Sequence, residues 1–191
     1  MYNFVRKQNL CEAIMNLYIV RHGRTEYNEN HLYCGRIDAP LSKSGLEQLP
    51  ALAEQAKQLH LDAIISSPLK RAVTTASAIA DACGLTVKID DRIIERDFGD
   101  YDGKYFDIDG NEALYWHNFA YRYPNGESFF QVVQRVYNCL DDIRSTYADK
   151  NVMIVAHGVV CRAIITYIRD ITNDEFFKLY YHNCQILKFE I

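Results

Sequence analysis

Short apolar segments of β-forming residues alternate along this chain with longer segments in which apolar residues recur at helical spacing. The apolar segments are 17–20, 63–65, 87–89, 152–155 and a last one at 186–191. Because they are continuously apolar, we expect strands buried on both faces, as in a parallel sheet covered by helices. Helices are predicted at 44–59, 67–83, 129–143 and 158–169. The pattern predicts an α/β protein, a three-layer α/β/α sandwich with a mostly parallel sheet.

A single domain accounts for nearly all of the chain, which has 191 residues and can bury a core without disulfides. We expect residues 15–191 to form this domain and residues 1–14 to be an extension outside the core. The stretch at about 98–126 is rich in glycine, aspartate and aromatic residues and has no clear period. It predicts a small cap inserted into the sandwich.

The charge balance excludes several classes of partner. The net charge is −4, so no overall positive field would attract nucleic acid or an anionic membrane surface. No apolar run approaches the roughly 20 residues of a membrane span, and residues 1–16 do not resemble a signal peptide. The six cysteines are scattered without paired spacing, so we expect reduced thiols and a cytoplasmic protein. Cys161 follows His157 by four residues, and we expect a buried thiol rather than a metal ligand.

Polar residues follow two of the predicted strands at their C-terminal ends. Arg21, His22 and Gly23 come directly after the first strand, and His157 follows the strand at 152–155. The C-terminal edge of a parallel sheet is where ligand sites form. Ser67 and Pro68 are predicted to be the N-cap and first residue of a helix, which places Arg71 one turn into it. Two imidazoles and two guanidinium groups at one edge favour a phosphate site.

The ordered set of short motifs in this chain resembles the histidine phosphatase superfamily, the phosphoglycerate mutase-like enzymes. The resemblance covers nearly the whole chain from Leu17 onward. It comprises Arg21-His22-Gly23 with Thr25 and Asn28, Pro40-Leu41 with Gly45, Ser66-Ser67-Pro68-Leu69 with Arg71, Thr75-Ala76, Glu95 with Phe98-Gly99, Pro124, Gly126-Glu127-Ser128, and His157-Gly158. An Arg-His-Gly triplet alone is a weak signal, whereas the ordered set is specific.

The resemblance implies a role for each matching residue. His22 would attack the phosphoryl group and form a phosphohistidine, and Glu95 would carry the proton to the leaving oxygen and from the attacking water. His157 is expected among the catalytic residues and also at the phosphate. The phosphate-binding residues would be Arg21, Asn28, Arg71 and His157. From composition alone, an exposed carboxylate in a charged run is the preferred interpretation of Glu95, and the resemblance around Phe98-Gly99 reverses this preference.

No metal or other cofactor is implied, because cationic side chains would offset the phosphoryl charge. The acidic residues after Gly99 lack the order of an EF-hand, so we expect a solvated acidic loop; they are Asp100, Asp102, Asp107, Asp109 and Glu112. The cap contains many aromatic residues, which either pack the cap onto the sheet or line the substrate mouth: Tyr105, Phe106, Tyr115, Trp116, Phe119, Tyr121 and Tyr123.

The predicted function is a metal-independent phosphomonoesterase that acts through a phosphohistidine on small phosphorylated metabolites and releases inorganic phosphate. A phosphoglycerate mutase is the alternative within the same family. Only about thirty residues separate Gly99 from the next long helix, which is short for the closing insertion a mutase would need. A module that binds a phosphorylated ligand without catalysis is a weaker alternative, since the complete catalytic set is present.

Overall fold

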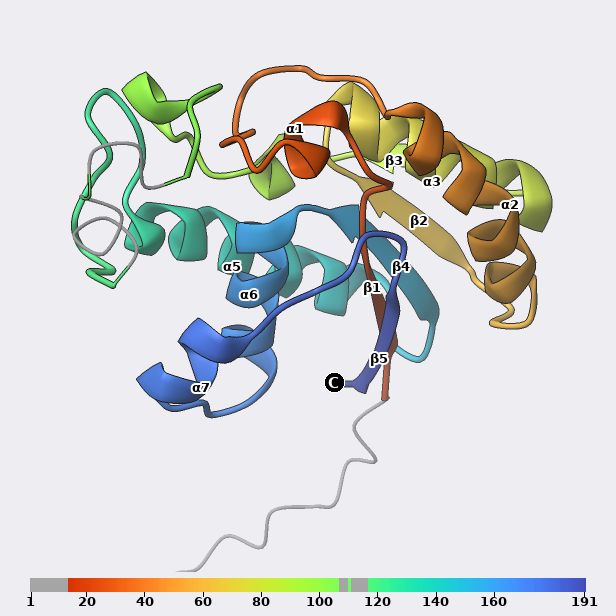
Figure 1. Cartoon of the computed structure of the whole chain (residues 1–191). Coiled ribbons are helices and arrows are strands. Elements are labelled where there is room, and N and C mark those ends of the chain that lie inside the picture. Colours follow the sequence, from red (N-terminus) through yellow and green to blue (C-terminus); the bar gives the residue numbers. More distant parts are fainter. Residues whose placement is uncertain (1–13, 107–109, 111–116) are drawn as a thin grey trace, which may run out of the picture.

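Five strands form one sheet at the centre of the molecule, in the order β3-β2-β4-β1-β5 (Figure 1). The structure, a computed structural model, describes residues 14–106, 110 and 117–191. The strands are β1 (Asn16–Arg21), β2 (Ala63–Ser66), β3 (Val87–Ile89), β4 (Asn151–Ala156) and β5 (Ile186–Glu190). The first four are parallel and β5 is antiparallel to β1, so the C-terminal ends of β1, β2 and β4 meet at one edge.

Helices cover both faces of this sheet. They are α1 (Glu26–Glu29), α2 (Lys43–Lys57), α3 (Lys70–Cys83), α5 (Phe129–Thr146), α6 (Gly158–Ile168) and α7 (Asn173–Lys178). Figure 1 shows α2 and α3 on one side of the sheet and α5 and α6 on the other. The predicted three-layer α/β/α sandwich with a mostly parallel sheet is confirmed. Among the described residues, no helix is long and apolar enough to cross a lipid bilayer.

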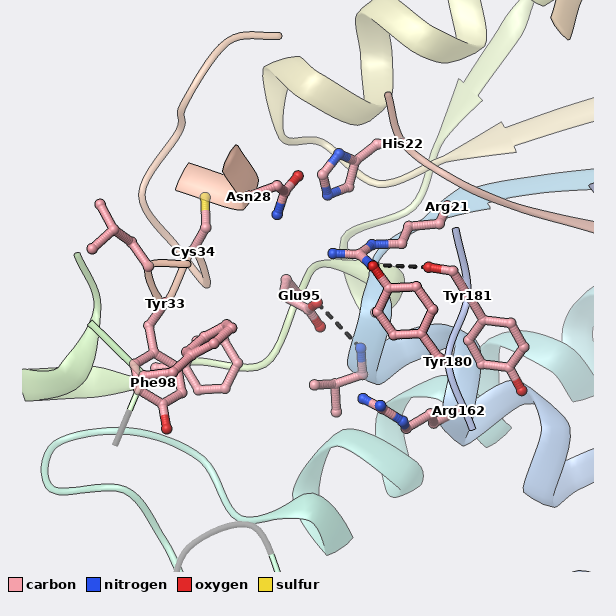
Figure 2. A pocket seen from close by; sticks show the side chains of 14 residues that line it. Arg21, His22, Asn28, Tyr33, Cys34, Glu95, Phe98, Arg162, Tyr180 and Tyr181 are labelled. Atoms are coloured by element: carbon pink, nitrogen blue, oxygen red, sulfur yellow. Dashed lines mark hydrogen bonds between the residues drawn. The ribbon is translucent and has the colours of Figure 1, made fainter. Parts of the chain in front are cut away.

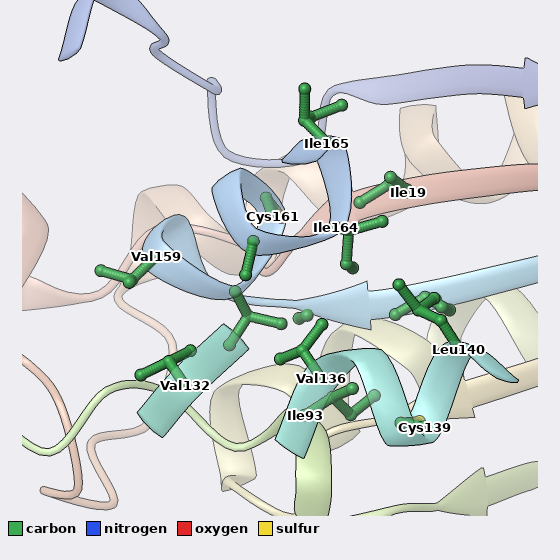
Figure 3. Packing of buried hydrophobic residues seen from close by; sticks show 14 of the residues in the cluster. Ile19, Ile93, Val132, Val136, Cys139, Leu140, Val159, Cys161, Ile164 and Ile165 are labelled. Carbon is green, nitrogen blue, oxygen red and sulfur yellow. The ribbon is translucent and has the colours of Figure 1, made fainter. Parts of the chain in front are cut away.

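The central strand β1 supplies apolar side chains to two separate cores. Tyr18 and Val20 pack with α2 and α3, whereas Leu17 and Ile19 face α5 and α6. Figure 3 shows the second core, in which Val136 of α5 lies beside α6 and β4. A fully buried aliphatic side chain contributes about 1.5–3 kcal/mol to folding. Burial on both faces explains why the strand is continuously apolar and why its polar residues lie at its ends.

Helix α3 begins later than the sequence predicts. Its first residue is Lys70 and its N-cap is Leu69, so Ser67 and Pro68 precede the helix instead of opening it. The Ser67 hydroxyl lies 2.6 Å from Nε2 of His157, and the carboxylate of Asp38 accepts the Lys70 N–H at 2.6 Å. A carboxylate from a distant loop therefore takes the place of the expected serine cap. Arg71 lies in the first turn rather than one turn in.

The loop after His22 is held by close contacts with α2 and α3. The N–H of Gly23 donates to Oγ1 of Thr75 at 3.0 Å. A Cβ atom added to Gly45, in the first turn of α2, would lie 2.0 Å from the carbonyl oxygen of Arg24. Only glycine allows the two backbones to approach so closely. The loop is thereby fixed from behind, which fixes the direction of the His22 side chain.

Asp102 differs from the solvated acidic loop predicted at this place. Its carboxylate accepts the N–H groups of Gly35, Arg36 and Ile37 at 2.6, 2.8 and 2.9 Å. A short side chain with two acceptor oxygens is well suited to three successive backbone donors. Asp102 therefore anchors residues 35–37. Asp107, Asp109 and Glu112 of the same acidic group lie outside the described residues.

The start of the domain is tied to the end of the chain. Met15 is buried, and its N–H and carbonyl groups both pair with Ile191 at 3.0 Å. The predicted extension at 1–14 lies, apart from Ile14, outside the described residues and stays a prediction, as do the exact limits of the cap. Cys161 is a buried residue of the second core, as expected. Free thiols are found at Cys34, Cys83, Cys139, Cys161 and Cys184, whereas Cys11 lies outside the described residues.

Candidate active site

A cavity of about 280 Å³ opens at the C-terminal ends of β1 and β4. Four predicted site residues line it: Arg21, His22, Asn28 and Glu95. Figure 2 shows Glu95 across the cavity from His22, with the Arg21 guanidinium beside both. The sheet places Arg21 and His22 because β1 ends there, α1 places Asn28, and the segment after η1 (Asp91–Ile93) places Glu95.

The hydrogen bond of His22 fixes which ring nitrogen can react. Nδ1 of His22 lies 2.6 Å from the carbonyl oxygen of Gly23. A carbonyl oxygen only accepts, so Nδ1 must carry the proton in the neutral ring. Nε2 therefore has the free electron pair, which is the chemical requirement for a nucleophile.

The two predicted imidazoles are neighbours. The ring centroids of His22 and His157 are 5.0 Å apart. His157 is fully buried beneath the cavity, where its Nε2 is bound to the Ser67 hydroxyl. Its Nδ1 has no hydrogen-bond partner among the described residues. Buried polar atoms are rarely left without a partner, so this nitrogen is available to a bound ligand.

Two arginines leave further buried donors beside the imidazoles. Nη1 of Arg21 donates to the carbonyl oxygen of Tyr181 at 2.9 Å, and its Nε is buried without a partner in the described part of the chain. Nε of Arg71 is also buried without a hydrogen-bond partner among the described residues. The positive charges of both arginines act on both rings. Three orphaned nitrogen atoms and two fixed positive charges make the site suited to an anion.

Arg71 reaches the site differently from the prediction. It is fully buried and does not line the cavity. Its Nη1 donates to the carbonyl oxygen of Ile37 at 2.8 Å, and its Nη2 donates to those of Cys34 and Gly35 at 3.1 and 2.8 Å. Direct contact between Arg71 and a phosphate thus stays a prediction. The contacts present make Arg71 the support of residues 34–37, which Asp102 holds from the other side.

Asn28 presents a donor to the cavity. Its Oδ1 accepts the N–H of Thr25 at 3.2 Å within a capping box and lies 3.4 Å from Nδ2 of Asn183. Since the oxygen is occupied, the NH2 group is the part that faces the cavity, as Figure 2 shows. The amide adds a neutral donor to the cationic groups around the anion site.

Glu95 is a buried acid, so the alternative of an exposed carboxylate is excluded. Only 5% of the residue is exposed. Its Oε1 accepts the N–H of Arg96 at 2.8 Å, and its Oε2 accepts the N–H of Val159 in the first turn of α6 at 3.2 Å. These two bonds hold the carboxylate at the cavity wall opposite the nucleophilic nitrogen.

Comparison with known proteins agrees with this geometry. The family model described as histidine phosphatase superfamily (branch 1) matches residues 17–191. The chain belongs to this superfamily. It is 35% identical to phosphoserine phosphatase 1 of Hydrogenobacter thermophilus over 157 residues, covering 79% of the chain and 74% of that protein. It is 30% identical to the probable phosphoglycerate mutase GpmB of an Enterobacter species, covering 93% and 85%.

A solved structure of another member has the same fold. It is mycobacterial glucosyl-3-phosphoglycerate phosphatase in complex with VO3, with a TM-score of 0.82 and 28% sequence identity. The match covers 91% of this chain and 90% of that one. The resemblance read from the short motifs is confirmed, including the mutase-like relatives.

Several residues at the site of this histidine phosphatase were not found from the sequence. Tyr180 and Tyr181, in the segment between α7 and β5, line the cavity together with Cys34 and Arg162. A run of aromatic and polar residues before the last strand was the available signal. Among the described cap aromatics, Phe106 lines the cavity, whereas Tyr123 is buried against Phe98 and Tyr33. Tyr115 and Trp116 lie outside the described residues.

Burial makes both active-site imidazoles of this histidine phosphatase poor bases. It lowers the pKa of His22 and of His157 well below the ordinary value, and the charges of Arg71 and Arg21 lower both further. Both rings are therefore neutral at pH 7. The unfolded chain, whose histidines titrate near about pH 6.5, takes up protons that the native state does not.

The contribution of these two histidines to the free energy of unfolding is therefore expected to be fully present above about pH 6.5 and to be lost as the pH falls below it. The slope approaches about 1.4 kcal/mol per pH unit for each of the two histidines. Urea unfolding without phosphate at pH 7, 6 and 5 measures this, with His157→Gln as the comparison. The variant should have a shallower pH dependence, because one of the two groups is gone. Parallel curves for the two proteins would contradict the assignment.

Arg135 of α5 is a positioning residue that the sequence did not reveal. Its Nη1 donates to the carbonyl oxygens of Arg92 and Ile94 at 2.7 and 2.5 Å, and its Nη2 donates to that of Glu95 at 3.1 Å. The same guanidinium forms two hydrogen bonds with the carboxylate of Glu127, at 3.1 and 3.0 Å. One side chain thus fixes the backbone that carries the acid.

We expect Arg135→Met to lower kcat by about 10²-fold with a smaller change in KM, because the acid loses its position while the phosphate donors remain. Arg135→Lys should restore part of the rate, since it keeps the charge toward Glu127. Gln134→Met, an exposed neighbour on the same helix, is the control. Steady-state kinetics at a temperature where all variants are folded decides the matter. A rise in KM alone would show that Arg135 does not act through Glu95.

Proposed function

We propose that this protein is a metal-independent phosphomonoesterase that hydrolyses small phosphorylated metabolites through a phosphohistidine. The observation that supports this most is the pairing of a neutral His22, with its Nε2 electron pair free, and Glu95 on the opposite wall of the same cavity. Membership of the histidine phosphatase superfamily makes the chain a phosphoric monoester hydrolase by type.

In the first step, Nε2 of His22 attacks the phosphorus atom in line with the ester oxygen. The N–P bond forms while the P–O ester bond breaks, and the electron pair of that bond goes to the leaving oxygen. The protonated Glu95 gives its proton to this oxygen, so that the leaving group departs as a neutral alcohol. Nδ1 of His22 keeps its proton throughout and donates it in a hydrogen bond to the carbonyl oxygen of Gly23, which holds the ring in place.

In the second step, a water molecule replaces the leaving alcohol beside Glu95. The carboxylate takes a proton from the water as its oxygen bonds to phosphorus, and the N–P bond breaks. His22 regains its electron pair, Glu95 is protonated again, and inorganic phosphate is released. Each group returns to its starting state, so no other reactant is needed.

Cationic and neutral hydrogen-bond donors together supply the electrostatic stabilisation. Arg21, the NH2 group of Asn28 and Nδ1 of His157 are the proposed partners of the phosphoryl oxygens. In a buried site such preorganised donors act strongly on the charge of the transition state. Relatives whose names refer to phosphoserine and to glucosyl-3-phosphoglycerate phosphatases support a small phosphorylated metabolite as the substrate. A cytoplasmic location and the absence of nucleic acid partners stay predictions.

Release of inorganic phosphate from p-nitrophenyl phosphate, with and without EDTA, tests the proposal. We expect turnover that the chelator leaves intact. Loss of activity with EDTA and its recovery with magnesium would overturn the metal-independent mechanism.

In a second experiment, the enzyme is incubated with 3-phosphoglycerate and the products are followed by phosphorus NMR. Isomerisation to 2-phosphoglycerate faster than phosphate release would identify a mutase instead. Binding of vanadate without turnover of any phosphate ester would identify a binding module.

A further inference from the structure

A second cavity of about 380 Å³ adjoins the one that holds His22. The two cavities share four lining residues: Arg21, Asn28, Phe106 and Tyr180. Arg21 and Asn28 belong to the proposed phosphate site, whereas the rings of Phe106 and Tyr180 are half-exposed or more. A substrate held by its phosphate at Arg21 can therefore extend between these rings into the second cavity.

The second cavity has a cationic side chain of its own, which the mechanism above does not use. Arg24 lines it, and among the described residues no carboxylate lies within ion-pair distance of its guanidinium. The backbone of Arg24 is fixed, since its N–H donates to Gln48 and its carbonyl oxygen accepts the N–H of Ser42. The Arg24 side chain is thus attached to a fixed backbone at the lining of the second cavity.

Glu29 is the acidic residue of this lining, and it is already engaged. Its Oε1 accepts the hydroxyl groups of Ser42 and Ser44 at 2.7 and 2.5 Å. These two bonds lower the pKa of the carboxyl group, to which Arg24 contributes less. With Arg21 and Arg24 both in its lining beside this one carboxylate, the cavity keeps an excess of positive charge.

Two further polar side chains complete the lining. Asn183 spans the boundary between the cavities, since its Nδ2 donates to the carbonyl oxygen of His22 at 2.7 Å. His31 is exposed and lines the cavity, and its carbonyl oxygen accepts the N–H of Phe106 at 3.1 Å. The second cavity is therefore built from elements that are fixed to the phosphate site itself.

We infer that the second cavity is a subsite for a second anionic group of the substrate, a carboxylate or a further phosphate, with Arg24 as the residue that recognises it. This inference rests on the proposed function and narrows its substrate class. A phosphate ester whose leaving group is itself anionic fits both cavities, because its two negative ends would meet Arg21 and Arg24. An uncharged leaving group would leave Arg24 without a counter-charge.

Matched pairs of substrates test the subsite. 3-Phosphoglycerate is compared with glycerol 3-phosphate, which has a hydroxymethyl group in place of the carboxylate. Glucose 1,6-bisphosphate is compared with glucose 6-phosphate, which distinguishes a second phosphate from a carboxylate. The quantity measured is the ratio of kcat/KM within each pair, for the wild type and for Arg24→Gln, Arg24→Lys and Lys150→Gln. Lys150 is an exposed cation before β4, at the opposite edge of the sheet.

We expect the wild type to prefer the doubly anionic member of at least one pair. Arg24→Gln should lower that ratio about tenfold, the loss typical of one charge-assisted contact. Arg24→Lys should keep most of the preference, and Lys150→Gln all of it. Ratios near one in the wild type, or a preference that survives Arg24→Gln, would overturn the subsite while p-nitrophenyl phosphate is still hydrolysed. Failure to hydrolyse any of these esters would overturn the proposed function and the subsite with it.

Discussion

Replacing His22 with alanine is expected to reduce turnover of p-nitrophenyl phosphate by at least about 10⁴-fold, because nucleophile and general acid act as one unit. The remaining donors would still bind phosphate, but no phosphohistidine could form without His22. Because His22 borders an open cavity, its loss should leave folding largely intact. Rapid quench of the wild type in alkaline detergent with labelled substrate should trap a phosphoenzyme that is stable in alkali and is lost on later acid treatment, as expected for a phosphoramidate. The variant should yield none.

The control for this experiment is His60→Asn. His60 is an exposed histidine with a positive φ of 48°, a conformation that asparagine tolerates, and it lies before β2 at the far edge of the sheet. Its activity should equal that of the wild type. Substantial turnover by His22→Ala, measured after titration of active sites to exclude contamination, would remove His22 from the nucleophilic role.

Glu95→Gln is expected to slow turnover by about 10²–10⁴-fold for substrates with poor leaving groups, the range of general acid–base catalysis. Glutamine keeps the shape, and its one carbonyl oxygen can accept one of the two backbone N–H groups, but it has no acidic proton to give. The loss should be largest for an alkyl phosphate, whose alkoxide needs the proton, and smaller for p-nitrophenyl phosphate. The slope of log kcat/KM against leaving-group pKa therefore steepens in the variant.

Glu54→Gln provides the matched comparison, since Glu54 is an exposed acid of α2 that pairs with Lys57. Its slope should overlay that of the wild type. If Glu95→Gln slowed the alkyl and the nitrophenyl esters equally, the acid would have to be sought elsewhere. A phosphoenzyme that accumulates in Glu95→Gln would in turn support its second task, the activation of water.

The sequence was most informative where a single local pattern determines the structure. Continuous apolar runs identified the strands because both faces of the sheet are covered. The polar residues after β1 and β4 were therefore placed correctly at one edge, which brought His22 and His157 together. The cap was harder to read, because Phe106 and Tyr123 belong to the same aromatic stretch and yet one lines the cavity while the other is buried.

Contacts between distant segments account for what the sequence did not predict. Asp38 caps α3 from a loop 32 positions away, so the local pattern at Ser67 pointed to the wrong first residue. Arg71 bonds to carbonyl oxygens of residues 34–37, which no periodicity reveals. Asn183 enters the site because β5 runs antiparallel to β1 and returns the chain to the sheet edge. Each case depends on tertiary placement rather than on local propensity.

Residues 34–37 have a consequence for exchanging specificity between members of the superfamily. The carboxylate of Asp102 accepts hydrogen bonds from backbone N–H groups of this segment, and the guanidinium of Arg71 donates to its backbone carbonyl oxygens. A cap transplanted from a relative would therefore disturb Arg71, whose charge acts on the imidazoles of His22 and His157. Chimaeras that receive the cap together with the relative's segment equivalent to residues 34–37 should retain activity, whereas those that receive the cap alone should lose it. The unit that must be exchanged is thus the cap together with residues 34–37, and not the cap alone.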